Sequence, residues 1–160
     1  MSAPHLLSIY LQDHHAGAIA GANLARRAAG ANEGTEYGDE LERIAAEIEA
    51  DKDALERVMD ELDVGRDQIK DYGAWAGEKL GRLKRNGRWL DYSPLSRMLE
   101  LEGLMLGVNG KLALWGALER SHGEVIGGVS IAELAARAED QRSRLDVLRL
   151  RAAQQALTSD

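Results

Sequence analysis

The segment SPLSRMLELEGLMLGVNGKLALWGALERSHG, residues 93–123, decides the fold of this chain. It opens with Ser93, a residue type that caps helix starts, and with Pro94, which suits the first helical position. Gly123 stands where a long helix would end, because glycine commonly follows the last helical turn. The segment therefore predicts one long helix over residues 94–122.

Hydrophobic periodicity predicts three further long helices, over residues 5–29, 39–64 and 131–157. Asp39 is the expected cap of the second, and a capping box that begins at Ser130 opens the last. Small and apolar residues recur at helical spacing in the first of them: Leu6, Leu7, Tyr10, Gly17, Ala18, Gly21, Leu24, Ala25 and Ala28. We therefore expect an all-α fold, a four-helix bundle in a single domain over residues 1–160.

A shorter and poorer pattern over residues 66–85, with three internal glycines, predicts an additional connecting helix between the second and third long helices. The other two connections are short and favour antiparallel hairpins. The long connection is compatible with two topologies. In one it crosses back along the whole bundle, and in the other it packs at one end of a simple up-down bundle.

Composition excludes several function classes. The 160 residues include no cysteine, which rules out disulfides, thiolate metal sites and cysteine nucleophiles. No apolar run is long enough for a signal peptide or a membrane span, so we expect a cytoplasmic protein without a membrane partner. The net charge of −7 opposes a nucleic-acid partner. No phosphate-binding glycine loop, GxSxG elbow or HExxH motif occurs, so no catalytic residue is predicted and an enzyme is not favoured.

Polar residues interrupt the apolar face of each long helix. His14 lies near the centre of the first apolar face, whereas His15 is expected to face solvent. In the crossover topology, His14, Asp51, Asn109 and Gln141 lie at similar heights and predict a structural polar layer. In the up-down topology, Glu102 replaces Asn109 in that layer and Gln141 lies away from it.

The helix number, the helix lengths and the long connection resemble the ferritin-like superfamily, whose bundle cores hold metal ions between carboxylate and histidine ligands. That resemblance implies an iron or manganese site, for which His14, Asp51, Glu102 and Glu47 are the candidate ligands. The superfamily pattern includes two Glu-x-x-His motifs. This sequence has one, Glu119 to His122, and it lies at a helix end.

The chain also resembles a group of small bacterial helical proteins that share the segments Tyr10–His14, Gly81–Lys84 and Tyr92–Glu102. That resemblance supports the helical-bundle prediction and a ferritin-like relationship, and it implies no activity. Within the predicted helices, Gly17 with Gly21 and Gly103 with Gly107 have GxxxG spacing, which predicts close internal packing of helix backbones.

Residues 79–97 form a basic segment with six Lys or Arg and one Asp, a net charge of +5 that leaves −12 for the rest of the chain. It could pair with the acidic stretch 47–63, attach to another subunit, or bind phosphate. Its candidate anion-binding residues are Arg82, Lys84, Arg85, Arg88 and Arg97.

Three functions follow from these patterns. The first is a non-catalytic cytoplasmic helical bundle that self-associates, most simply as a dimer, or binds a partner. The second is a ferritin-like protein that binds iron or manganese for redox or storage chemistry. The third is an anion-binding module centred on the basic segment.

Overall fold

The computed structural model describes residues 3–66 and 92–158, and these residues are predominantly helical. Four long helices are present among them: α1 (His5–Ala31), α2 (Gly38–Glu61), α4 (Pro94–His122) and α5 (Ile131–Thr158). The prediction of an all-α chain is confirmed. The bounds of α4 and the starts of α1 and α5 are those predicted from the sequence, and the remaining bounds differ by one to three residues. The predicted connecting helix over residues 66–85 lies almost wholly outside the described residues.

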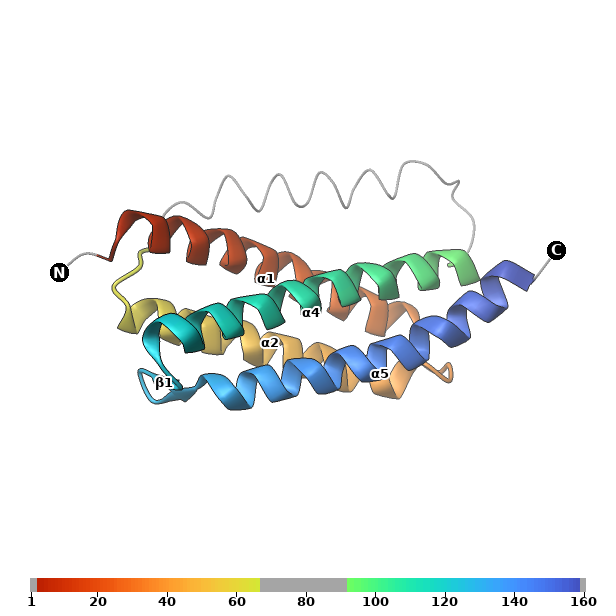
Figure 1. Cartoon of the computed structure of the whole chain (residues 1–160). Coiled ribbons are helices and arrows are strands. Elements are labelled where there is room, and N and C mark those ends of the chain that lie inside the picture. Colours follow the sequence, from red (N-terminus) through yellow and green to blue (C-terminus); the bar gives the residue numbers. More distant parts are fainter. Residues whose placement is uncertain (1–2, 67–91, 159–160) are drawn as a thin grey trace.

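The helices form two antiparallel hairpins that lie face to face (Figure 1). One hairpin is α1 with α2, the other is α4 with α5, and α1 also packs along α4. No described helix combines the length and apolar character that a membrane span requires.

The described contacts distinguish the two topologies left open by the sequence. The side chain of Gln12, near the start of α1, donates to the carbonyl of Gly65, 2.9 Å away, just beyond α2. At the other end, Arg97 in the first turn of α4 donates to Asn32 just beyond α1, at 2.6 Å. Since α1 is about 40 Å long, Gly65 and Arg97 lie at opposite ends of the helices. The described helices therefore have the directions that the crossover topology predicts.

Local cap chemistry explains where α4 and α5 begin. The hydroxyl of Ser93 accepts from the backbone N–H of Ser96 at 3.1 Å, and Ser130 accepts from Glu133 at 3.3 Å. The predicted Asp39 cap is wrong, because α2 begins one residue earlier, at Gly38. A side-chain Cβ at that glycine would lie 2.6 Å from the carbonyl oxygen of Asn32, so the turn between α1 and α2 requires a glycine there.

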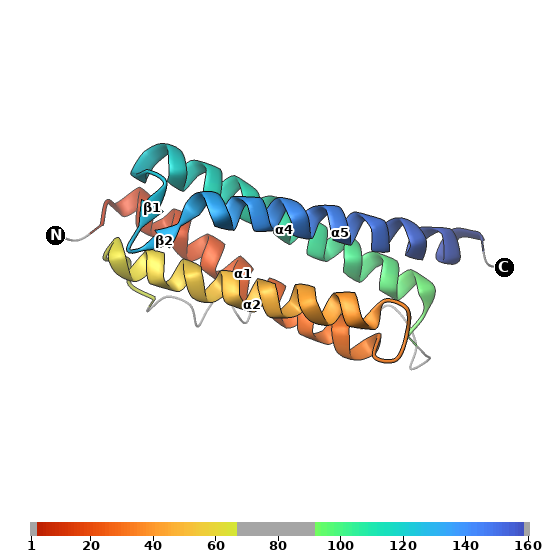
Figure 2. The same ribbon diagram turned by 90° about the horizontal axis from the view of Figure 1, so that it is seen from below.

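A small antiparallel hairpin, which the sequence analysis did not predict, joins α4 to α5. Its strands are β1 (Val125–Ile126) and β2 (Val129–Ser130), and the turn between them is Gly127–Gly128. Both glycines have positive φ, 54° and 75°, as two-residue hairpin turns require. Figure 2 shows the hairpin at the end of the molecule where α1 begins and α2 ends.

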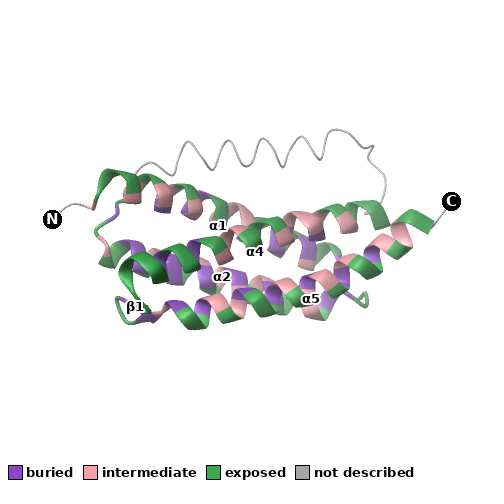
Figure 3. Cartoon of the chain, in the orientation of Figure 1, coloured by how far each residue is buried: buried purple, intermediate pink, exposed green. Residues whose placement is uncertain are grey.

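The core runs along the inward faces of all four helices (Figure 3). Burial of these apolar faces, rather than intrinsic helix propensity, supplies most of the stability of helices that pack together. The largest fully buried side chains include Leu11, Ile44, Leu55, Met59, Leu101, Trp115 and Leu118.

Candidate functional site

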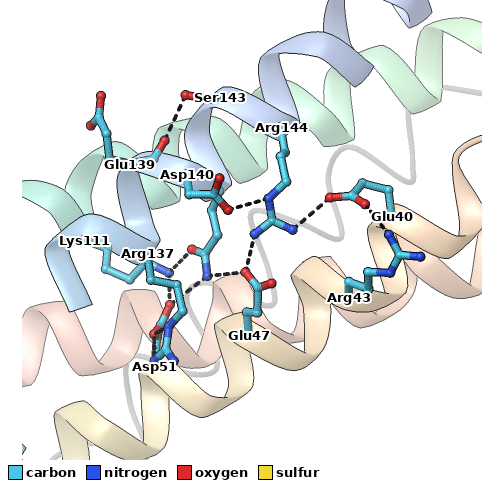
Figure 4. A network of polar contacts seen from close by, with 11 residues as sticks. Glu40, Arg43, Glu47, Asp51, Lys111, Arg137, Glu139, Asp140, Ser143 and Arg144 are labelled. Atoms are coloured by element: carbon cyan, nitrogen blue, oxygen red, sulfur yellow. Dashed lines mark hydrogen bonds and ion pairs between the residues drawn. The ribbon is translucent and has the colours of Figure 1, made fainter. Parts of the chain in front are cut away.

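A buried carboxylate lies at the centre of the helices (Figure 4). The side chain of Asp51 on α2 is 1% exposed. Its Oδ2 accepts from Nζ of Lys111 on α4 at 2.5 Å and from Nε2 of Gln141 on α5 at 3.0 Å. Its Oδ1 accepts from Nε of Arg137, also on α5, at 2.7 Å. Both oxygens of this carboxylate are therefore used by side chains from two other helices.

The network continues along the seam between α2 and α5. The amide of Gln141 accepts from Lys111 at 2.6 Å and donates to Glu47 at 3.1 Å. Arg144 then donates to Glu47 at 2.5 Å and to Glu40 at 2.8 Å. Long charged side chains thus bridge α2 to α5, and opposite charges alternate along the seam.

Lys111 is the internal cation of this network. Burial lowers the pKa of its ammonium group, and the nearby negative charge of Asp51 opposes that effect. A buried carboxylate needs a compensating charge, and here a lysine and an arginine supply it. Lys111 was not among the residues predicted from the sequence. Its spacing from Leu104, Val108 and Trp115 places it on the buried face of α4 and could have identified it.

The burial of the two adjacent histidines differs from that predicted. His15 is the buried one, 2% exposed, and its Nε2 lies 2.8 Å from Oε1 of Glu56. His14 is half-buried and packs edge to face on Tyr10, with 4.6 Å between ring centroids. Adjacent side chains on a helix point about 100° apart, and the buried face of α1 includes Leu11 and His15.

The other predicted polar and metal-ligating residues have mixed outcomes. Asp51 and Gln141 are buried, as expected for a polar layer. Asn109 is exposed, so its predicted place in the layer is wrong, and Lys111 supplies the polar group of α4 instead. Glu102 is partly exposed, 3.9 Å from Arg149. Within residues 3–66 and 92–158, no three His, Asp or Glu side chains are grouped as metal ligands would be.

The candidate ligands therefore do not fit a metal ion as they stand. Glu47 and Asp51 are hydrogen-bonded to arginine, lysine and glutamine, and these donors occupy the oxygens that a metal would need. The described residues give the iron or manganese prediction no support.

A second feature is a cavity of about 310 Å³ between α1, α2 and α4, which is open to solvent on the side where Gly17 and Gly107 are exposed. Its volume lies within the range of small-molecule binding sites. Apolar side chains and glycines form most of the described wall: Gly17, Ala18, Gly21, Ile48, Leu55, Leu104, Gly107, Val108, Gly110, Leu114 and Trp115.

The glycines face open space, which corrects the prediction of close backbone packing. A side-chain Cβ at Gly17, Gly21 or Gly107 would meet no described atom within 4 Å. Only Gly103 of the predicted GxxxG pairs is closely packed, with 3.2 Å to Leu24. In sequence, a glycine face looks the same whether it packs on a helix or lines a cavity.

A few polar groups belong to the cavity wall. His14 lines it, and burial lowers the pKa of that imidazole, while the negative charge of Asp13 opposes the shift. Trp115 is 1% exposed, and its indole N–H has no hydrogen-bond partner in the described part of the chain. Asp51 and Lys111 also contribute to the wall, so the buried ion pair and the cavity are neighbours.

The basic segment is described only from residue 92 onward. Arg97 donates to Asn32 and stacks over the ring of Tyr37, with 4.5 Å from its guanidinium carbon to the ring centroid. Its guanidinium is thus engaged within the chain. The other four candidate anion-binding residues lie outside the described residues: Arg82, Lys84, Arg85 and Arg88. The anion-binding site therefore stays a prediction.

A polar cluster around Asn32, which the sequence analysis missed, closes the end of the helices where α4 begins. Asn32 is fully buried, and its amide donates to the carbonyl of Ala28 and to the hydroxyl of Tyr92. Tyr92 in turn donates to Glu100 at 2.7 Å. Every polar atom of the Asn32 side chain is used, which is typical of a structural cluster.

Comparison of the sequence with protein families and with curated proteins, and of the fold with solved structures, finds no significant match. The geometry described above is therefore the basis for the function proposed below.

Proposed function

We propose that this chain is a non-catalytic four-helix bundle that acts by binding a partner molecule in the cavity between α1, α2 and α4. The observation that carries this proposal is the cavity itself, about 310 Å³ in volume, with a wall of glycine and apolar side chains. Sites for small molecules are mostly apolar and concave, and they often lie between the helices of bundles.

The glycines strengthen the proposal because they are costly in helices. Each glycine inside a helix destabilises it by about 0.5–1 kcal/mol relative to alanine. For Gly17, Gly21 and Gly107, no described neighbour requires the missing side chain. Room for a bound molecule is a physical reason to keep these positions free of a side chain.

A ferritin-like relationship is part of the proposal. Its support is the arrangement of two antiparallel hairpins whose described ends require a crossover along the bundle. In this chain, the ammonium group of Lys111 lies beside the central carboxylate and neutralises it. The alternative of iron or manganese chemistry lacks a donor set among the described residues. Dimer formation and a cytoplasmic location stay predictions from the sequence.

Thermal unfolding with isopropylbenzene, an apolar probe without a charge, tests whether the cavity binds. At ten times its dissociation constant, the probe should raise the unfolding temperature of the wild-type chain by roughly 3–5 °C. Gly107→Leu fills the cavity and should abolish this rise. Gly116→Leu is the matched control, because Gly116 is also in α4 but outside the cavity wall, and it should keep the rise.

Two results would overturn the proposal. One is no stabilisation of the wild-type chain at saturating probe. The other is equal stabilisation of wild type and Gly107→Leu, which would mean that the probe binds elsewhere. Gly17→Leu fills the same cavity from α1 and provides a second variant if Gly107→Leu does not fold.

A further inference from the structure

The open side of the cavity carries a carboxylate that has no counter-ion among the described residues. Asp13 on α1 lines the cavity and is exposed, and it forms no ion pair with a lysine or arginine in residues 3–66 and 92–158. It stands four residues before Gly17, so both residues share one face of the helix. Since Gly17 faces open space, a molecule in the cavity would lie beside this carboxylate.

The neighbouring imidazole does not neutralise Asp13 at neutral pH. His14 also lines the cavity, and burial lowers its pKa below the ordinary value of 6.5, while the charge of Asp13 opposes that effect. An imidazole with such a pKa is mostly uncharged at pH 7. Because Asp13 acts on the protonation of His14, the negative charge of its carboxylate is felt in the cavity wall.

The two lysines of the described wall are engaged by other carboxylates. The ammonium of Lys111 contacts Asp51. The ammonium nitrogen of Lys52 lies 2.9–3.7 Å from three carboxylates: Asp53, Glu49 and Glu56. An anionic ligand would have to displace one of these carboxylates from its lysine, and Asp13 would repel it. The charges of the wall therefore disfavour an anion and favour a cation.

The rest of the wall indicates the body of the ligand. Most of the described surface is apolar and includes Leu55, Leu104 and Val108. A volume of about 310 Å³ corresponds to roughly ten water-sized groups at the volume that water takes in the liquid. Because the cavity is open where Gly17 and Gly107 are exposed, a charged end of the ligand can stay partly hydrated there. The fitting ligand is therefore small, with an apolar body and a charged end.

We propose that the cavity binds a small organic cation, an amine whose apolar body lies between α1, α2 and α4 and whose ammonium group pairs with the carboxylate of Asp13. This inference rests on the proposed binding function and adds the chemical class of the ligand. It uses three separate observations: the apolar wall, the engaged lysines and the Asp13 carboxylate at the open side.

Three probes that share a phenyl ring and the same number of non-hydrogen atoms test the class. They are 1-phenylethylamine, a cation at neutral pH, isopropylbenzene, which has no charge, and benzoate, an anion. Dissociation constants are measured at pH 7 by ¹H–¹⁵N titration of the full-length chain. The amide resonances of Gly17 and Gly107 report whether each probe lies in the cavity.

The amine should bind roughly fivefold more tightly than benzoate, because Asp13 attracts one charge and repels the other. Asp13→Asn should weaken 1-phenylethylamine about threefold, as expected for loss of an ion pair open to solvent, and should leave isopropylbenzene unchanged. Added salt should weaken the amine in the wild-type chain and much less in Asp13→Asn.

Glu42→Gln is the matched control for this charge change. Glu42 is an exposed carboxylate of α2 that lies outside the cavity wall. Its replacement removes the same charge as Asp13→Asn and should leave the affinities for all three probes unchanged. A loss of amine affinity in Glu42→Gln equal to that in Asp13→Asn would refute a specific pairing with Asp13.

The ligand class and the binding site can fail separately. If isopropylbenzene binds in a manner abolished by Gly107→Leu, but Asp13→Asn leaves the affinity for 1-phenylethylamine unchanged, the binding site stands and the cation class is wrong. Benzoate affinity equal to or above that of the amine would also refute the class. If none of the probes binds the wild-type chain, both the ligand class and the proposed function are refuted.

Discussion

The ammonium nitrogen of Lys111 lies 2.5 Å from Oδ2 of Asp51. Asp51 belongs to the α1–α2 hairpin and Lys111 to the α4–α5 hairpin, so this ion pair joins the two halves of the molecule. Gln141 hydrogen-bonds to both side chains. Because any sliding of one hairpin past the other would separate buried charges, the pair fixes how the hairpins are aligned.

Removal of one partner from this pair should destabilise the fold strongly. Asp51→Leu leaves Lys111 mostly buried without its carboxylate, which should lower the free energy of unfolding by about 3–5 kcal/mol. The double variant Asp51→Leu/Lys111→Met removes both charges and should lose less than the sum of the two single losses, by at least ~1 kcal/mol. Urea unfolding at neutral pH measures all four proteins. Strict additivity would contradict the pairing.

The protonation of His14 should reflect its burial in the cavity wall. Burial lowers the pKa of this imidazole, and the charge of Asp13 partly offsets that effect. An NMR titration of the His14 ring should therefore have its midpoint below the ordinary value of 6.5. Asp13→Asn should move the midpoint lower still. A midpoint at or above 6.5 in the wild-type chain would contradict the described burial.

The lowered pKa of His14 also makes the stability of the folded chain depend on pH. The folded chain binds the His14 proton less readily than the unfolded chain, so the unfolded state gains protons first as the pH falls. The contribution of His14 is fully present above pH 6.5 and is lost as the pH falls through the lowered pKa of the folded state. His14→Leu should flatten this part of the stability curve in urea unfolding measured from pH 5 to 7.5.

Local signals explain how much of the fold could be predicted. Ser93 and Pro94 gave the start of α4 correctly because cap chemistry involves only neighbouring residues. The hairpin between α4 and α5 was missed, although Gly127–Gly128 is a typical turn pair, because its strands are two residues long and carry no periodicity. The crossover could not be chosen from sequence, since it depends on which helix ends lie together.

The candidate site was less predictable, for two physical reasons. A charged residue on a buried face, such as Lys111, is usually interpreted as a surface residue unless its partner is known. A glycine face, such as that of Gly17 and Gly21, is apolar in sequence whether a helix or empty space lies opposite. Asp51 and Gln141 were identified because each interrupts an apolar face at a position whose neighbours are clearly buried.

Replacement by alanine should lower the stability of the fold at Gly38 and raise it at Gly116, because the two glycines have different surroundings. In Gly38→Ala, the new Cβ would lie 2.6 Å from the carbonyl oxygen of Asn32, so the turn must shift and stability should fall by about 1–3 kcal/mol. Gly116→Ala adds a methyl group in open space within α4 and should raise stability by about 0.5–1 kcal/mol. Urea unfolding distinguishes the two signs, and equal signs would refute this explanation of Gly38.

Metal reconstitution should yield no specific site at the four predicted ligands. After incubation with Fe²⁺ or Mn²⁺ and desalting, wild type and His14→Ala should retain the same, substoichiometric amount of metal, because Asp51 and Glu47 are engaged by cationic side chains. Elemental analysis per chain measures this. About one metal ion per wild-type chain, lost in His14→Ala, would instead support the ferritin-like metal alternative.

A crystal of the full chain pressurised with xenon tests the binding cavity most directly, since xenon enters apolar cavities. We expect a xenon peak between α1 and α4, beside Gly17 and Gly107, and no such peak in the Gly107→Leu variant. Protein atoms that fill this space, or an absence of xenon there, would contradict the account.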